Sequence, residues 1–120
     1  SMSASSITGE TPKAVVTLSV DGTEKTGSAS GDGAVDASYK AVESIAPSES
    51  RLLLYSVNNI TTGTDAQGEV SVRLEKDGRI VNGSGADTDI VIASVKAYVN
   101  ALNRLSQRQF SVHPQLSGPV

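Results

Sequence analysis

Two stretches of the chain alternate between apolar and polar residues, and an Asp-Gly pair follows each of them. The apolar positions are Val16, Leu18 and Val20 in the first stretch and Val70, Val72 and Leu74 in the second. Alternation with a period of two predicts half-buried strands. The pairs at 21–22 and 77–78 tolerate the positive φ angles of a type I′ turn. Residues 23–30 and 79–82 should therefore return as the second arms of two hairpins.

Helical spacing of small and apolar residues follows each hairpin, over residues 34–45 and 90–105. Pro47 ends the first helix, because its ring restricts the preceding residue. Residues 51–60 form another strongly apolar strand, and residues 61–68 are predicted to be a polar loop. The order of strand, turn, strand, glycines and helix thus occurs twice, which indicates two pseudo-symmetric halves. Alanines on both helices favour an α+β fold with helices packed on antiparallel strands.

The expected organisation is one domain between two polar ends. Residues 1–12 form a leading segment with a possible edge strand near Ile7, and Ser1-Met2 is typical of a residual tag ahead of an introduced start. Residues 13–105 form the domain, with one module to about residue 47 and a second from about residue 50. Residues 106–120 form a C-terminal tail that we expect to be frayed.

Composition mainly excludes classes of function and does not point to a particular one. The 120 residues carry a net charge of −3 without a basic stripe, which argues against a nucleic-acid partner. The chain has no Cys, no apolar run long enough to span a membrane and no signal-peptide pattern, so cytoplasmic localisation is compatible. Only 3% of residues are aromatic, so the core must be aliphatic, and dimerisation would help to stabilise it.

Two glycine-rich segments carry the most suggestive chemistry. Residues 31–36 (the first glycine segment) and residues 83–89 (the second) each lie between a predicted strand and a helix. Free backbone N–H groups at such a helix start can bind a carboxylate. The alternative is structural: the glycines permit a turn, and Asp36, Thr88 or Asp89 caps the helix.

Catalytic and metal-binding chemistry is poorly represented. The single histidine, His113, lies in the polar tail, and no nucleophile has a paired base, so we predict no catalytic residue. The aspartates of the glycine segments have no imidazole or thiolate companions, so no metal site is predicted. Tyr98 falls on the apolar stripe of the second helix and should be in the core. The Tyr55 hydroxyl is equally able to bind a ligand or to reach the rim of the sheet.

The two glycine segments and the sequence of residues 93–103 (ASVKAYVNALN) together resemble the regulatory domain of 2-isopropylmalate synthases, over nearly all of residues 14–105. The resemblance implies two βββα modules, a homodimer, and feedback inhibition by L-leucine bound between the modules. It implies a transferase of leucine biosynthesis whose separate catalytic barrel uses a divalent metal, whereas this fragment holds no cofactor and is not an enzyme by itself. The leucine site carried over by matching motif comprises Gly31, Asp32, Gly33, Ala34, Val35, Asp36, Leu52, Tyr55, Asn59, Ala66 and Ile90.

One geometric difficulty follows from this set. Strict alternation places Leu52 and Tyr55 on opposite faces of their strand, so both reach one ligand only through a bulge or an edge position. Two other functions remain open. One is an isoleucine-sensing domain of a citramalate synthase, because one methyl group in an apolar slot discriminates by only about 1–3 kcal/mol. The other is a dimerisation module without a ligand.

Overall fold

The computed structural model describes residues 11–62, 65–106 and 110–112. In chain order its elements are β1 (Lys13–Val20), β2 (Thr23–Ser30), α1 (Ala34–Ile45), β3 (Arg51–Thr62), β4 (Asp65–Lys76), β5 (Arg79–Asp87), α2 (Ile90–Ser106) and β6 (Phe110–Val112). The strands form two antiparallel sheets, ordered β2-β1-β6 and β3-β4-β5. This arrangement confirms the predicted α+β class with helices on antiparallel sheets.

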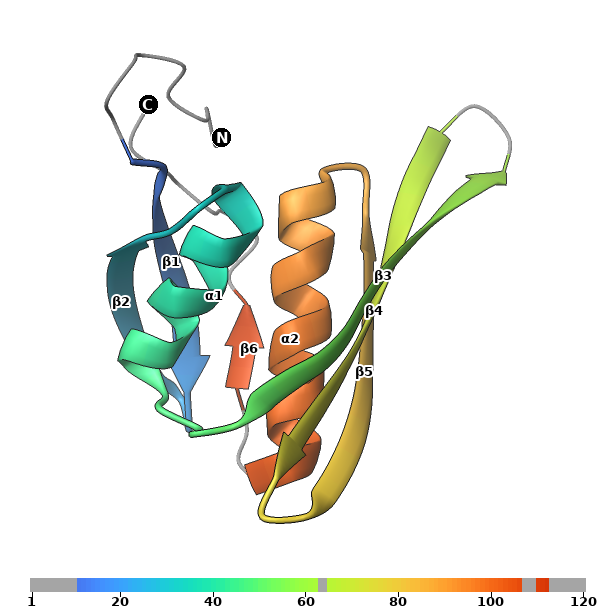
Figure 1. Ribbon diagram of the computed structural model, residues 1–120. Helices are drawn as coiled ribbons and strands as arrows, with labels where there is room; N and C mark the ends of the chain where they lie inside the picture. The colour runs from blue at the N-terminus through green and yellow to red at the C-terminus, as the bar shows by residue number, and fades with distance from the viewer. Residues whose placement is uncertain (1–10, 63–64, 107–109, 113–120) are drawn as a thin grey trace.

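The helices lie between the two sheets and run in the same direction (Figure 1). Helix α1 packs on β1 and β2, whereas α2 contacts β4 and β5 on one side and β6 on the other. Because α2 is covered by both sheets, its buried residues surround most of the helix, and Tyr98 is among them at 5% exposure. The prediction that Tyr98 belongs to the core is therefore confirmed. Within the described residues, neither helix is long and apolar enough to cross a membrane.

The repeat predicted from the sequence is present in the backbone. Both hairpins turn through an Asp-Gly pair with positive φ, at 51° and 87° for Asp21 and Gly22 and at 52° and 83° for Asp77 and Gly78. These angles are the left-handed values that a type I′ turn requires. In β1 the alternation is realised as four buried apolar side chains, Ala14, Val16, Leu18 and Val20, which face the helices.

Close approach of helix to sheet depends on glycine in the strand arms. A Cβ added to Gly83 of β5 would lie 2.5 Å from the backbone nitrogen of Ala101, and one added to Gly85 would lie 2.6 Å from that of Ala97. Gly27 in β2 is likewise pressed against α1. The sequence analysis assigned Gly83 and Gly85 to a loop before α2, and this was wrong, because β5 continues to Asp87.

Two other sequence predictions differ from the structure. The polar loop expected at residues 61–68 is mostly strand, since β3 extends to Thr62 and β4 begins at Asp65. The tail expected to be frayed contains β6, whose backbone pairs with β1 at Leu18, Ser19 and Val20. Polar residues obscured the strands in both segments. The ends of β3 and β4 pair with each other close along the chain, at Thr61–Ala66 and Thr62–Asp65, whereas β6 pairs with the distant β1. The possible strand near Ile7 and the tail residue His113 lie outside the described residues.

Candidate functional site

The first glycine segment leads from β2 into α1 without a side-chain cap. Gly31 is buried, and its N–H donates to the Pro12 carbonyl at 2.9 Å, which ties the segment to the start of β1. Gly33 is the N-cap residue of α1, in an extended conformation with φ −157°, and no side chain accepts a hydrogen bond there. The backbone N–H groups of the first turn of α1 therefore face outward at the positive end of the helix dipole.

Asp36 stabilises the same segment from within. Its Oδ2 accepts a hydrogen bond from the Asp32 N–H at 2.9 Å and lies 3.2 Å from Lys40 Nζ. The Asp32 N–H bond is the main reason that the pKa of Asp36 lies below its usual value, and Lys40 adds to the effect. Asp36 is thus an ionised support of the loop rather than the cap of α1. Asp32 itself is exposed, while Ala34 and Val35 are partly buried.

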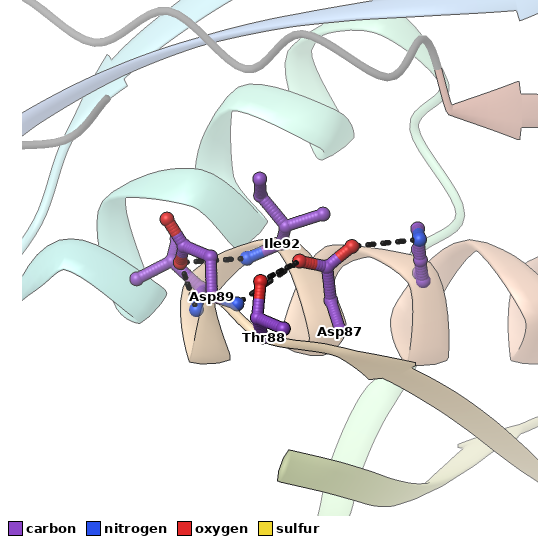
Figure 2. A network of polar contacts seen from close by, with 6 residues as sticks. Asp87, Thr88, Asp89 and Ile92 are labelled. Carbon is purple, nitrogen blue, oxygen red and sulfur yellow. Dashed lines mark hydrogen bonds and ion pairs between the residues drawn. The ribbon is translucent and has the colours of Figure 1, made fainter. Parts of the chain in front are cut away.

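The second helix start is closed by its own side chains (Figure 2). Asp89 Oδ1 accepts hydrogen bonds from the backbone N–H groups of Val91 at 2.8 Å and Ile92 at 3.3 Å, as an N-cap residue does. Asp87 accepts the Asp89 N–H at 2.9 Å through Oδ1 and pairs with Lys96 at 2.9 Å through Oδ2. The structural alternative is correct here, with Asp89 rather than Thr88 as the cap, and α2 offers little to an anion.

The N-terminal ends of α1 and α2 differ at the residue that precedes each helix. Gly33 and Asp89 occupy equivalent places in the repeat, since each immediately precedes the first residue of its helix. One carries a carboxylate that fills the helix terminus, and the other has no side chain. Only the first glycine segment therefore keeps the anion-receiving geometry that the sequence suggested for both.

Strand β3 presents an uncovered row of apolar side chains. Leu52 pairs with Leu74 and Tyr55 with Val72, and these two β4 side chains are buried beneath α2, so all four lie on the helix-facing side of the sheet. Leu52 and Tyr55 share this face because a register shift between residues 52 and 54 inserts an extra residue in β3. The bulge that the leucine site required is present, and β3 is also an edge strand.

Val57 extends the same row, because it pairs with the buried Val70. Leu52, Tyr55 and Val57 remain 44%, 36% and 43% exposed, respectively, although they face the helix layer. Ile90, at 37% exposure, lies at one end of this row, since its Cδ1 would lie 2.5 Å from a Cβ built on Gly68, which pairs with Asn59. Together these four side chains define what we call the β3 stripe. Val57 was missed by the sequence analysis, although its alternation with Tyr55 is visible in the sequence.

Three tyrosines connect the β3 stripe to both helices. The rings of Tyr39 and Tyr55 meet edge to face at 6.3 Å between centroids, and those of Tyr39 and Tyr98 stack at 4.3 Å. The Tyr55 hydroxyl lies 2.7 Å from Ser94 Oγ, so it points inward to α2 rather than to the sheet rim. Tyr39 lies on α1 within one turn of Val35 and Asp36. The tyrosines thus connect the first turns of α1 to the β3 stripe through the contact of Tyr39 with Tyr55.

The remaining candidate residues are placed by backbone alone. Asn59 lies in β3 opposite Gly68, and Ala66 lies in β4 opposite Thr61, but their side chains fall outside the described part of the structure. Two cavities, of about 90 and 230 Å³, open elsewhere, the first beside Leu102 and the second beside Arg73, and neither is lined by a candidate leucine-site residue. Across residues 11–62, 65–106 and 110–112, no three His, Asp or Glu side chains gather as metal ligands would.

Comparison with known proteins assigns the chain to a family. Residues 1–106 match the family described as the LeuA allosteric (dimerisation) domain. Among similar proteins, the 2-isopropylmalate synthase of Methylococcus capsulatus is 67% identical over 91% of this chain and 21% of its own length. The 2-isopropylmalate synthases of Aromatoleum aromaticum and Thiobacillus denitrificans are 63% and 60% identical over 91% and 97% of the chain. The chain spans less than a quarter of the length of these relatives, at 21% to 23%. The chain belongs to the LeuA allosteric (dimerisation) domain family.

Proposed function

We propose that this domain binds L-leucine at the first glycine segment and the β3 stripe, and thereby mediates feedback inhibition of a 2-isopropylmalate synthase. The observation that carries the proposal is the uncapped start of α1, since the equivalent start of α2 is filled by Asp89. The exposed apolar row of β3 is linked to α1 by the contact between the rings of Tyr55 and Tyr39. The relatives are named 2-isopropylmalate synthases, which favours leucine as the ligand over isoleucine, the ligand expected for a citramalate synthase.

The three chemical parts of leucine match three features of this region. Its carboxylate suits the free N–H groups at the first turn of α1, where the helix dipole favours an anion. Its isobutyl group suits Ile90, an exposed apolar side chain beside Gly68 of β4. Leu52 lies opposite Leu74, six β4 residues or about 20 Å farther along the sheet, so it does not share this contact. The ammonium group of leucine suits an oxygen acceptor, and Tyr55 supplies one at the edge of the apolar row. A ligand with a charged pair at one end and a branched apolar tail is thus complementary to the region.

The rest of the parent protein follows from the same assignment. The parent chain would carry a catalytic barrel that condenses acetyl-CoA with 2-oxoisovalerate in the cytoplasm. A divalent metal would be bound by that barrel. Leucine would inhibit only if it binds more tightly to a domain state that disfavours turnover. In isolation the domain would be a regulatory module without enzyme activity.

The direct test is isothermal titration of the domain with leucine, isoleucine and valine in parallel. Saturable binding of leucine, with weaker binding of the other two, would support the proposal. A preference for isoleucine would move the assignment to a citramalate synthase. Absence of binding by all three, in a folded dimer, would instead favour a ligand-free dimerisation module.

Homodimer formation is the second part of the proposal, and the β3 stripe supports it. Exposed leucine, tyrosine and valine side chains gather on β3. An exposed apolar row on a folded domain commonly marks an interface, so this row is a candidate dimer interface. Val57→Asp places a charge in the middle of this row and should shift the domain to monomer in sedimentation equilibrium. Ile80→Asp is the matched control, because Ile80 is 56% exposed on β5 but lies outside the stripe. A Val57→Asp domain that stays dimeric would refute this interface.

A further inference from the structure

The second sheet has one face under α2 and an opposite face that neither helix covers (Figure 1). Because side chains alternate along β4, Val72 is buried beneath α2, whereas Ser71 and Arg73 point to the uncovered face. The cavity of about 230 Å³ opens there and reaches α2 past the edge strand β5. None of its lining residues is acidic, and they include Leu54, Ser71, Arg73, Asn82, Ser84 and Arg104.

The two arginines of this cavity lack an acidic partner. Arg51 pairs with Glu75 at 2.8 Å, and Arg79 donates to the last carbonyl oxygens of α2, so both of these guanidinium groups are engaged elsewhere. Arg73 donates its Nε to the amide oxygen of Asn82 at 3.0 Å, which is a neutral acceptor. Within the part of the chain that the structure describes, neither Arg73 nor Arg104 forms a salt bridge. Two positive charges thus face one cavity uncompensated.

A backbone donor of β5 points to the same region. The Ser84 N–H donates to Asn100 Oδ1 on α2 at 3.1 Å, so it faces the free edge of β5 and not β4. Backbone groups alternate along an antiparallel strand, so the Asn82 N–H faces this edge as well. Arg104 follows Asn100 by one helical turn and lies on the same side of α2. Donors from a sheet face, a strand edge and a helix therefore converge.

We propose that this cavity binds the phosphate group of a small phosphate monoester. Two guanidinium groups match the charge of about −2 on a phosphate at neutral pH. Each guanidinium offers paired N–H donors to its oxygens. Leu54 pairs with Arg73 across the sheet and is 44% exposed, so it suits an apolar group attached to the phosphate.

Size and charge restrict the occupant further. The cavity is smaller than the about 300–1,000 Å³ of a pocket for a drug-sized ligand, so it suits a small ester and not a polypeptide segment. The whole chain has a net charge of −3, so it does not attract anions in general, and binding would require this local arrangement. The site shares no residue with the proposed leucine site, and the inference is independent of the proposed function.

The test is an NMR titration of the amide groups of the 120-residue chain with inorganic phosphate, phenyl phosphate and succinate, at neutral pH and constant ionic strength. Both phosphates should shift the Asn82 and Ser84 amides saturably at millimolar concentration. Phenyl phosphate should bind about threefold or more tightly than inorganic phosphate, because contact with Leu54 removes apolar area from water. Succinate carries two carboxylates and should bind more weakly than either phosphate, and equal binding would overturn the assignment to phosphate.

Matched arginine variants locate the site. Arg73→Gln and Arg104→Gln should each weaken phosphate binding by about tenfold or more, the value of one hydrogen bond between charged groups. Arg51→Gln is the control, because Arg51 is also exposed on the uncovered face but pairs with Glu75 outside the cavity. It should leave the affinity within about twofold. Amide signals remote from the cavity report whether each variant keeps its fold.

Three results would overturn the proposal. The first is the absence of saturable shifts at Asn82 and Ser84 with both phosphates. The second is a set of shifts centred on the first turn of α1, which would place anion binding at the first glycine segment. The third is equal weakening by Arg73→Gln and Arg51→Gln, which would indicate general electrostatic attraction and no defined site. Each result leaves the leucine titration, and thus the proposed function, to be decided separately.

Discussion

Replacing Gly33 with Asp tests whether the open start of α1 receives the ligand carboxylate. The substitution copies Asp89, which occupies the equivalent position and caps α2 through the N–H groups of Val91 and Ile92. Gly33 accommodates a side chain, since its φ of −157° is an extended conformation that any residue adopts and an added Cβ would meet no atom within 4 Å. The new carboxylate should therefore fill the terminus that leucine would use.

The expected effects on stability and on binding have opposite signs. Exchanging glycine for aspartate at an N-cap position stabilises a helix by a few tenths of a kcal/mol, and favourable interaction with the dipole can bring this to about 1 kcal/mol. Leucine would lose two backbone N–H donors to its carboxylate, at about 1.5 kcal/mol or more for each charged hydrogen bond. A total of about 3 kcal/mol corresponds to a loss in affinity of about a hundredfold.

Urea unfolding measures the first effect, and isothermal titration with leucine measures the second. Gly33→Ala is the control, because it fills the same space without an acceptor and should retain leucine binding. If Gly33→Asp bound leucine as tightly as the unchanged domain while its stability rose, the carboxylate would have to bind elsewhere. The first glycine segment would then be a structural loop only.

Three other substitutions test the packing and electrostatics of the second module. Gly83→Ala would place a Cβ 2.5 Å from a backbone nitrogen of α2, so urea unfolding should show a loss of about 1–3 kcal/mol, whereas Gly33→Ala should show little change. Asp89→Ala removes the cap of α2 and should cost about 1 kcal/mol by the same measurement, with exposed Thr88→Ala as its control. The pKa of Asp87 is lowered from 3.8, first by the Asp89 N–H, so its stabilising contribution is present above pH 3.8 and is lost as the pH falls through the folded value. Asp87→Asn should therefore be less stable than the unchanged domain at neutral pH, and the difference should shrink in acid unfolding below about pH 3.8. A difference that is independent of pH would contradict this role.

Local signals in the sequence predicted most of the fold. The Asp-Gly pairs specify their turns through backbone angles, and the alternation at Val16 and Leu18 reports burial of one face of β1, so both depend on neighbouring residues only. The predicted helices end within one residue of the observed bounds, because apolar spacing and Pro47 are also local signals. Pairing over longer distances was not predictable in this way.

The second glycine segment shows why a motif alone is ambiguous. Glycine at 83 and 85 is equally consistent with a flexible loop and with a strand approached closely by a helix, and only the position of α2 decides between them. The candidate site likewise depends on how separate elements pack or pair. The bulge in β3 that brings Leu52 and Tyr55 to one face is set by pairing with β4. The sequence analysis showed that a bulge or an edge position was needed, but it could not show where in β3 a bulge would occur. Ser94 falls on the apolar face of the second helix in the sequence, but its contact with Tyr55 depends on where β3 lies.

The position of β6 has a consequence for the order in which the domain assembles. Val20 of β1 pairs with Phe110, so a neighbour of the first strand is synthesised only after both helices and the whole second sheet. Pairing between such distant segments is slow, because a long loop must close before the contact forms. The hairpin β1–β2 can fold early with α1, but its sheet gains β6 only at the end of translation of this region. β6 would thus be the last strand to pair, and it would join the first module to the second by contacting both β1 and α2 once they have folded.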